Sequence, residues 1–440
     1  MVNNIKKFSL KKKIFFILVA ILGVFLIFAF NFPLGEYVDS KVNGNSGIAR
    51  VPNVVDYKRG KLKELPKYDE NSKKQWQVDL RSYDLSELNV KNNLKDLMYA
   101  HFDSKTKWSS DIPKEFDRQA IMEYGKNPGL NLRKLHEKGI TGKGVSMAII
   151  DQTLLTEHEE YKDRLKFYEE IHNNEEGGAS MHGAAVSSIA VGKTVGVAPE
   201  ADLYYIAETH GKFTLSSMVT GLTSDYKYLA KSIDRIIEIN KTLPKEKKIR
   251  VISMSIGWNK GEKGFNEIDS AVKRAKNEGM LVVSTSFNRY YGVNFWGLGR
   301  ESMKNPEDFK SYEPGEFWKD EFFKNDEKFH NERFDVGKNF MVPMDSRCTA
   351  SPTGKSDYVF YREGGLSWTV PYIAALYTLC CQVNPDITPD EFLKAVLDAG
   401  DVVQIEKEGK KYNLGKIVNP EKLIEKISSK EVYSYEGFRM

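Results

Sequence analysis

Short apolar runs recur along the second half of the chain and alternate with longer amphipathic stretches. Four of the runs have the length and the continuous apolarity of strands that are buried on both faces. They are VSMAIID (145–151), ADLYYIA (201–207), IRVISMSI (249–256) and MLVVSTS (280–286). Helical patterns separate them, over 183–191, 216–240 and 265–278. This alternation predicts a three-layer α/β fold, with a mainly parallel sheet and helices on both faces.

One further helix is marked near the C-terminus by its ends. Thr388 and Glu391 have the spacing of a capping box, with Pro389 at the first helical position. Gly400 then ends the helical pattern. The sequence therefore predicts a capped helix between these positions.

The N-terminus carries an apolar segment of a different kind. Residues 14–30 are uncharged and almost wholly apolar, close to the lower limit of about 17–25 residues for a membrane-spanning helix, and residues 31–34 extend them. Lysines precede this segment and none follows directly, which predicts a cytoplasmic N-terminus and an extracytoplasmic remainder. A cleaved signal peptide is the alternative, but Phe28, Phe30 and Phe32 occupy the place of its small residues. We expect residues 1–35 to be a basic tip and an uncleaved signal anchor, with membrane contact through residues 14–34.

The rest of the chain divides by composition. Residues 36–112 are polar with broken apolar patterning, which predicts a stalk or a small N-terminal extension. Residues 113–440 contain the α/β pattern. Within them, residues at about 289–341 mix many aromatic and charged side chains without regular periodicity, as in a long surface insertion. Two interpretations of it stay open: a loop or subdomain packed on its own aromatics, and a lid or substrate-binding edge.

Composition and charge narrow the class of protein. The chain has 440 residues with 41% hydrophobic and 29% charged residues, which is the composition of a folded globular protein. Five lysines before residue 14 contribute +5 to the net charge of +4, so residues 36–440 carry −1. We therefore expect no nucleic-acid partner. Three cysteines, two of them adjacent, support neither a disulfide framework nor a metal cluster.

Candidate chemistry begins with an aspartate at the end of a predicted strand. Asp151 closes the run 145–151, and open α/β sheets bind their ligands at the carboxyl ends of the strands. A turn aspartate is the alternative for a single Asp in this place. A functional interpretation therefore needs partners elsewhere in the chain.

Two residues qualify as partners. His182 stands beside Gly183 at the start of a predicted helix. Ser367 follows Gly364-Gly365 where another helix begins, so helix N–H groups and the positive end of the dipole lie near its hydroxyl. Pro371 fits the first turn of that helix. This arrangement suits a nucleophile whose reaction develops an oxyanion.

The order Asp151, His182, Ser367 resembles the subtilisin-like serine protease (subtilase) family. The strand ending in Asp151 matches the family's aspartate strand, His182-Gly183 its histidine motif, and Gly365-x-Ser367-x-Thr369-x-Pro371 its serine motif. Chymotrypsin-like enzymes have the order His, Asp, Ser. The α/β-hydrolases have Ser, Asp, His with a Gly-x-Ser-x-Gly elbow, which does not surround Ser367. The resemblance extends over roughly residues 128–428 and makes residues 113–440 a subtilisin-like peptidase domain.

Four further segments agree with this resemblance. Asn288 ends the segment that resembles the strand of the family's oxyanion-hole asparagine, and Ser253–Gly257 resembles the edge strand that pairs with substrate backbone. The other two are VGVAP (195–199) and GKIVN (415–419).

The resemblance implies acyl transfer by a triad. Ser367 would attack the peptide carbonyl, His182 would take and return the proton, and Asp151 would orient the imidazole. Asn288 and the Ser367 N–H would hold the oxyanion. The residues expected to bind substrate are Ser255, Ile256, Gly257 and Gly365.

The function expected from the sequence is a membrane-anchored, extracytoplasmic serine endopeptidase with a polypeptide substrate. The chemistry requires no cofactor, no metal ligands are assigned, and structural calcium stays open because a full ligand set does not emerge from the sequence. The alternative is a catalytically inactive peptide-binding or signalling module of the same fold. Departures from the family pattern around Asp151 and Asn288 motivate it: Gln152-Thr153 follow Asp151 where Ser or Thr and then Gly are usual, and Phe287 stands where a glycine is usual. Two further departures are Ala184-Ala185 after His182-Gly183, where Thr-His is common, and Trp258 after Gly257.

Overall fold

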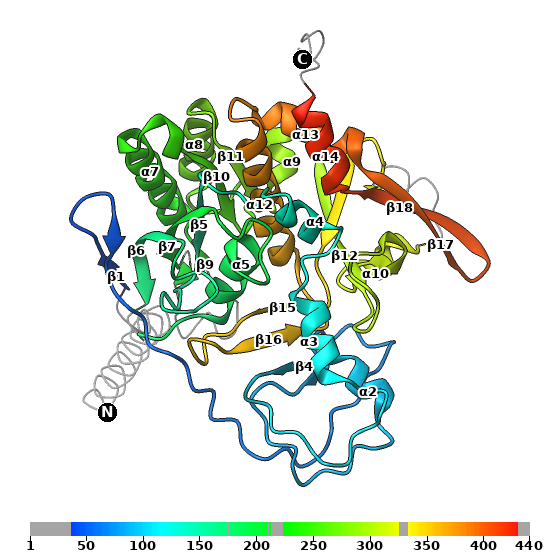
Figure 1. The fold of residues 1–440 in the computed structure, drawn as a ribbon. Coiled ribbons are helices and arrows are strands. Elements are labelled where there is room, and N and C mark those ends of the chain that lie inside the picture. Colours follow the sequence, from blue (N-terminus) through cyan, green and yellow to red (C-terminus); the bar gives the residue numbers. More distant parts are fainter. Residues whose placement is uncertain (1–36, 175–176, 210, 213–222, 325–332, 430–440) are drawn as a thin grey trace, which may run out of the picture.

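A mostly parallel sheet forms the central layer of the molecule (Figure 1). The computed structural model describes residues 37–174, 177–209, 211–212, 223–324 and 333–429. In this part of the chain the sheet has seven strands in the order β1-β6-β7-β5-β10-β11, with β2 beside β6. Only β1 runs antiparallel to its neighbour. The strands are β1 (Tyr37–Ser40), β2 (Gly47–Ile48), β5 (Ser146–Asp151), β6 (Leu165–Asn174), β7 (Asp202–Glu208), β10 (Ile249–Met254) and β11 (Leu281–Ser284).

Helices cover both faces of this sheet. Successive residues of a strand point to opposite faces, so the apolar residues of a strand such as β5 contact helices on both sides. Met147 and Ile149 of β5 belong to a buried cluster with α5 (Met181–Val191) and α12 (Leu366–Val383). Ala148 and Ile150, the alternate residues, belong to a second cluster with α7 (Lys227–Thr242) and α8 (Phe265–Asn277). The predicted three-layer α/β fold is confirmed for the described residues. The four apolar runs are β5, β7, β10 and β11.

The helix α12 is the central helix on its face of the sheet. Among the described residues it is the one helix with the length and apolarity of a membrane span, and 78% of it is buried inside the protein. It packs on β5, β10 and β11 as well as on α5, so it is a core helix. The anchor predicted at residues 14–34 lies outside the described residues.

A second sheet, in the order β13-β12-β14-β18-β17, lies beside α12. Three of its strands, β12, β13 and most of β14, come from the segment 289–341, which the sequence predicts to be a long surface insertion. That prediction is wrong for β12 and β14, which pair in parallel and bury Phe295, Leu298 and Phe340 in the main core. The strands are β12 (Asn294–Arg300), β13 (Tyr312–Pro314), β14 (Asn339–Pro343), β17 (Asp401–Lys407) and β18 (Lys410–Ile417).

The connections of this second sheet are aromatic. Trp318 packs against Trp296 and Phe334 with ring centroids 5.0 and 5.2 Å apart. The segment thus does pack on its own aromatics, while its strands join the core. Aromatic residues in the irregular connections masked the strand pattern in the sequence. The short helices here are α9 (Phe287–Tyr291), η2 (Phe309–Ser311) and α10 (Lys319–Phe322).

The N-terminal extension packs on the α/β layers. Its strands β3 and β4 complete a four-stranded sheet in the order β15-β16-β4-β3, and Val78, Leu80 and Phe102 share a buried cluster with Phe360. Of the two forms predicted for residues 36–112, the described residues thus have that of an extension, drawn in blue and cyan in Figure 1. The extension contains β3 (Val78–Asp79), α2 (Leu94–Met98) and β4 (Ala100–Asp103), and its sheet is completed by β15 (Arg347–Ala350) and β16 (Tyr358–Tyr361). The helices α3 (Arg118–Lys126) and α4 (Leu132–Glu137) follow the extension in the chain.

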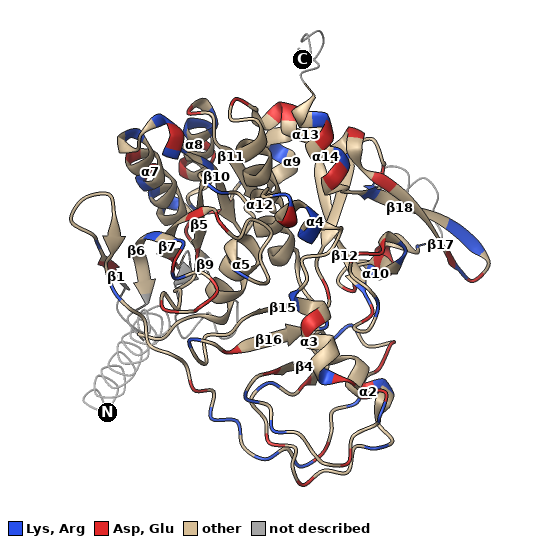
Figure 2. Cartoon of the chain, viewed as in Figure 1, with Lys and Arg blue, Asp and Glu red and all other residues tan. Residues whose placement is uncertain are grey.

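The predicted capped helix is α13 (Pro389–Ala399). The Thr388 hydroxyl accepts from the Glu391 N–H while the Glu391 carboxylate accepts from the Thr388 N–H, which confirms the capping box. In the view of Figure 2, acidic and basic residues mix on α7, α8 and α13. The remaining elements are β8 (Gly211–Lys212), β9 (Thr223–Ser224), η1 (Lys245–Lys247) and α14 (Pro420–Ser428).

Candidate active site

Asp151 and His182 meet at the carboxyl end of the central sheet. Asp151 is the last residue of β5, and His182 is the second residue of α5, whose N-cap is Ser180. The Nδ1 of His182 donates to the Asp151 carboxylate at 2.6 Å. The Asp151 side chain is 5% exposed and that of His182 is 22% exposed. This hydrogen bond fixes the orientation of the imidazole ring. Because Nδ1 carries the donated proton, Nε2 is the nitrogen of the neutral ring that can accept one.

Asp151 also sets the basicity of His182. Burial acts to lower the pKa of His182, but the negative charge of Asp151 and its hydrogen bond outweigh burial, so the pKa is raised above its ordinary value. A neutral ring at Nε2 accepts a proton more readily when the resulting cation is stabilised in this way. The pair therefore has the electrostatics of a general base with an orienting carboxylate.

The loop after Asp151 is held by Gln152, the residue that departs from the family pattern. The Gln152 N–H donates to the Asp151 carboxylate at 2.8 Å, and its side-chain oxygen accepts from Ser180, the N-cap of α5. The Tyr205 hydroxyl donates to the Gln152 carbonyl. A Cβ on Gly183 would lie 2.6 Å from that carbonyl, so only glycine lets α5 approach this closely. The loop is thus well supported without a glycine next to Asp151.

Ser367 lies at the start of α12 and is joined to Ser255. The Ser255 hydroxyl donates to the Ser367 carbonyl at 2.9 Å, and the Ser367 hydroxyl donates to the Ser255 carbonyl at 3.4 Å. No hydrogen bond joins Ser367 to His182 among the described residues, and in unliganded sites such contacts are often long. Pro371 was predicted to lie in the first turn of this helix. That prediction is wrong, because Pro371 is the sixth residue of α12.

A cavity of about 270 Å³ lies at this edge of the sheet. Asp151 and His182 line it together with Ser255 and Ile256, which were predicted to bind substrate. Sequence reasoning missed Glu208, a buried carboxylate at the end of β7. The sequence did contain a signal for Glu208, because this acidic residue follows an apolar strand run in the same way as Asp151. The other lining residues are Ile150, Gln152 and Leu229.

The remaining predicted site residues are more dispersed. Asn288 is exposed in α9, which follows β11. Gly365 is the N-cap of α12, and a Cβ there would meet open space. Gly257 does not line the cavity: its carbonyl accepts from Tyr226 at 3.1 Å, and a Cβ would lie 2.4 Å from Thr285 Oγ1.

The predicted edge strand at residues 253–257 is wrong in its position. The strand β10 ends at Met254 and lies between β5 and β11, so it is internal to the sheet. Residues 255–257 continue beyond it without strand structure. They reach the site because an internal strand ends there, close to β5.

The two bulky departures from the family pattern turn away from this cavity. Phe287 is buried and packs against Tyr291 and Phe295, with ring centroids 4.6 and 5.7 Å apart. Trp258 is buried too, and its indole N–H donates to the Tyr290 hydroxyl at 2.9 Å. Both residues therefore contribute to the core and do not line the cavity.

A second buried acid supports the loop that leads into α12. The Asp345 carboxylate follows β14 and accepts from the Gly364 N–H and the Glu316 N–H, each at 2.7 Å. Burial raises the pKa of Asp345 to about 7. No sequence pattern identified this aspartate, because the groups that donate to its carboxylate are backbone N–H groups of residues distant from it in the sequence.

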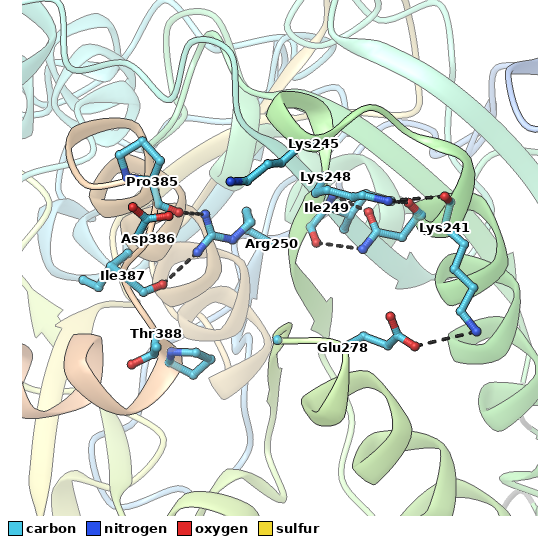
Figure 3. A pocket seen from close by; sticks show the side chains of 13 residues that line it. Lys241, Lys245, Lys248, Ile249, Arg250, Glu278, Pro385, Asp386, Ile387 and Thr388 are labelled. Atoms are coloured by element: carbon cyan, nitrogen blue, oxygen red, sulfur yellow. Dashed lines mark hydrogen bonds and ion pairs between the residues drawn. The ribbon is translucent and has the colours of Figure 1, made fainter. Parts of the chain in front are cut away.

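A larger hollow, of about 400 Å³, lies at the opposite ends of the strands (Figure 3). Two of its cations bind backbone carbonyls: Arg250 donates to the carbonyls of Pro385 and Ile387, and Lys248 donates to the Asn240 carbonyl at 2.6 Å. These contacts join the start of β10 to the loop before α13. The hollow therefore has a structural explanation and contains none of the predicted site residues.

The described residues contain no group of three or more His, Cys, Asp or Glu side chains placed to hold a metal ion. Cys348, Cys380 and Cys381 are free and buried.

Comparison with known proteins agrees with the motifs. Residues 142–313 match the model described as the Subtilase family (Peptidase S8), a stretch that includes Asp151, His182 and Asn288 but ends before Ser367. The major intracellular serine protease of Bacillus subtilis (strain 168) is 26% identical over an alignment of 185 residues, and the match covers 39% of this chain and 52% of that protein. The chain thus spans about half the length of this curated relative. The predicted resemblance to subtilisin-like serine proteases is confirmed.

Two solved structures are similar at lower identity. The prenylagaramide maturation protease PagA has 14% identity and a TM-score of 0.44, covering 67% of this chain and 98% of that one. A cold-adapted subtilisin-like serine proteinase has 16% identity and a TM-score of 0.39, covering 59% and 83%. Both TM-scores are below 0.5, so the fold rests on the strand order and helix placement described above.

Proposed function

We propose that this chain is a membrane-anchored, extracytoplasmic serine endopeptidase that cleaves polypeptides through Asp151, His182 and Ser367. The observation that carries the proposal is the hydrogen bond of 2.6 Å between His182 and Asp151 in a cavity that also exposes Ser255, the partner of Ser367. The match to the Subtilase family and the serine protease relative support the class of enzyme.

The proposed mechanism uses these residues as follows. Ser367 attacks the carbonyl carbon of the peptide bond, and its proton passes to Nε2 of His182. Asp151 stabilises the imidazolium that forms and keeps Nδ1 protonated. His182 then donates the proton to the leaving amine, and an acyl-enzyme remains on Ser367. Water hydrolyses this ester by the same route in reverse order.

The oxyanion is held by the Ser367 N–H and the side chain of Asn288. Ser367 is the second residue of α12, so its N–H is one of the helix N–H groups without an intrahelical partner. Ser255, Ile256 and Gly365 bind the substrate backbone near the nucleophile. Gly257 acts indirectly, because its tight packing beside Thr285 holds this segment in place. The reaction needs no cofactor, and no calcium ligands are assigned.

The location rests on the N-terminal segment. Residues 14–34 are uncharged and almost wholly apolar, and the lysines before them hold the N-terminus in the cytoplasm, so residues 36–440 lie outside. The relative from Bacillus subtilis is named as an intracellular protease, and that location belongs to the relative. The location proposed for this chain is inferred from its own N-terminal segment and is not taken from the name of the relative.

Nucleophile activation can be tested without knowing a substrate. The full chain is purified in detergent and treated with a fluorophosphonate probe, with Ser367→Ala and His182→Ala in parallel. Labelling of the wild type alone supports the proposal. If a wild type with a native circular dichroism spectrum stays unlabelled, the inactive peptide-binding module becomes the better interpretation.

Topology can be tested with single introduced cysteines. The native cysteines are buried, so an impermeant maleimide should react with intact cells only at the introduced positions. Lys91→Cys, at an exposed position of the extension, should be labelled in intact cells. Asn3→Cys should be labelled only after the cells are permeabilised. The reverse pattern would place the peptidase domain in the cytoplasm.

A further inference from the structure

A continuous series of aromatic contacts leads from the N-terminal extension to His182. The ring of Trp76 lies 6.0 Å from that of Tyr361, and Tyr361 lies 5.4 Å from Trp368. Trp368 directly follows Ser367, and its ring lies 5.5 Å from the ring of His182. The extension is therefore linked by packed side chains to both the base and the nucleophile of the proposed site.

The extension also holds the backbone that leads into α12. The Trp76 N–H donates to the Glu363 carboxylate at 2.9 Å. Arg81 donates to the Tyr361 hydroxyl at 3.4 Å and lies over the rings of Tyr361 and Trp76 at 5.4 and 5.0 Å. These contacts fix residues 361–363, directly before the glycines that precede Ser367.

Arg362, within the same loop, is buried between the extension and the core. Its guanidinium lies 4.8 Å above the ring of Tyr99 from the extension, and it is 2% exposed. On the core side, the Asp345 carboxylate accepts from the Gly364 N–H at 2.7 Å. The loop is thus bounded by the extension on one side and by buried polar groups on the other.

The backbone of Trp76 is in an unfavourable conformation. Its φ of 54° lies in the left-handed region, which bulky residues rarely adopt. Such a conformation persists only where surrounding contacts enforce it, and the hydrogen bond to Glu363 is one of them. The contact between extension and loop is therefore specific enough to hold a strained residue.

The middle of the series is closely packed. Tyr361 is fully buried and Trp368 is 3% exposed. Close-packed interiors transmit displacements because side chains have few voids into which to relax. A shift of Trp76 or Arg81 would therefore move Tyr361 and Trp368, and with them His182 and Ser367.

We propose that the N-terminal extension is a positioning element of the active site, in which Trp76 and Arg81 fix His182 and Ser367 through Tyr361 and Trp368. This inference rests on the proposed function. Trp76 and Arg81 are positioning residues, since both act through the loop 361–364 and neither lines the cavity.

The chain offers a matched control for each residue. Trp108 is another half-buried tryptophan of the extension, packed on Phe102 and Phe116 within the cluster of the extension. Arg59 pairs with the same carboxylate as Arg81, that of Asp79, but lies over Tyr83 and Tyr57. Among the described residues, no hydrogen bond, ion pair or ring contact joins either control to the loop 361–364.

The test compares Trp76→Ala with Trp108→Ala, and Arg81→Met with Arg59→Met, in the full chain. The first readout is the rate of fluorophosphonate labelling, and the second is the NMR titration of the His182 ring. We expect labelling to fall about 10- to 100-fold in Trp76→Ala and Arg81→Met, because displaced catalytic groups lose rate steeply. The titration midpoint of His182 should shift in the same two variants. The controls should stay within about twofold of the wild type after comparison at equal folded fraction.

Two outcomes overturn the inference. One is equal labelling and equal His182 titration in all four variants and the wild type. The other is a similar loss in the two controls, which would show a general effect of destabilising the extension. A wild type that is not labelled at all contradicts the proposed function instead, and the His182 titration then still decides whether Trp76 and Arg81 position this residue.

Discussion

The Ser255 hydroxyl donates a hydrogen bond of 2.9 Å to the carbonyl oxygen of Ser367. In a regular helix that oxygen would accept from the N–H of the residue four positions later. Here that residue is Pro371, which has no N–H. Ser255 therefore satisfies the carbonyl that the proline leaves without a helix partner, and it connects the segment after β10 to the start of α12 at the proposed nucleophile.

Replacing Ser255 by alanine should destabilise the protein by about 1–2 kcal/mol, because the Ser367 carbonyl would lose its hydrogen bond in a partly buried place. The measurement is urea unfolding followed by circular dichroism. Ser253→Ala is the matched control, since Ser253 lies two residues earlier, within β10, and its hydroxyl has no hydrogen-bond partner in the described residues. Equal stability of the two variants would show that the bond to Ser367 contributes little.

The raised pKa of His182 predicts how activity depends on pH. The proposed base works only when neutral, so activity should rise with pH around a midpoint above the ordinary value of 6.5. Asp151→Asn removes the charge that raises this pKa and leaves burial, which lowers it. The midpoint should therefore move to lower pH, while the maximal rate falls by about 10⁴, as for the corresponding change in a chymotrypsin-type protease.

The measurement is the pH profile of the fluorophosphonate labelling rate for the wild type and Asp151→Asn. The contribution of the His182–Asp151 pair to stability should fall as pH rises, whereas activity should rise. A folded pKa above the unfolded value means that the His182–Asp151 pair stabilises the protein fully below pH 6.5, and that this contribution is lost as pH rises through the folded pKa. A midpoint that stays unchanged in Asp151→Asn would contradict the role of this carboxylate.

The sequence predicted the parts of the structure whose signals are local. The strands β5, β7, β10 and β11 are continuous apolar runs, and buried parallel strands have that pattern. Asp151 and His182 could be proposed as candidates because Asp151 ends such a run, His182 stands at the start of a helix, and their order resembles that of a known family. The capping box of α13 is likewise encoded within four residues.

Contacts between distant segments could not be predicted in this way. The strands β3 and β4 have two and four residues, too few for a period. The partner of β4 is β16, about 260 residues later in the chain, and β3 then pairs with β4. Trp368 could be located in the serine motif, but its contacts with Tyr361 and His182 depend on how β16 and α5 pack beside the start of α12. Asp345 similarly acts through backbone groups that carry no sequence signal.

Replacing Asn288 by alanine should lower turnover if this side chain holds the oxyanion. Loss of one such donor, the corresponding asparagine, costs about 10²–10³ in kcat in a subtilisin, and we expect a similar loss here. The measurement is hydrolysis of fluorescent casein at saturating concentration. Arg289→Ala is the control, since Arg289 is the next exposed residue of α9 and packs over Phe265. An equal effect of both variants would assign the loss to α9 as a whole.

The last prediction concerns the attachment of the extension to the central sheet. Arg50, two residues after β2, donates to the carboxylate of Glu170 on β6 at 2.6 Å, and the Glu170 side chain is 1% exposed. Arg50→Met leaves that carboxylate buried without its cation, which should cost about 3–5 kcal/mol. Lys61→Met breaks an exposed pair with Glu87 and should cost at most about 1 kcal/mol. Urea unfolding measures both variants.

A second substitution separates charge from packing at this contact. In Arg50→Met with Glu170→Gln no buried charge is left unpaired, so the double variant should recover part of the lost stability. The Tyr168 hydroxyl, which donates to Glu170 at 2.6 Å, can still donate to the amide oxygen. If Arg50→Met destabilises the protein no more than Lys61→Met, the segment 37–50 is held by the pairing of β1 and β2 with β6 and not by this buried ion pair.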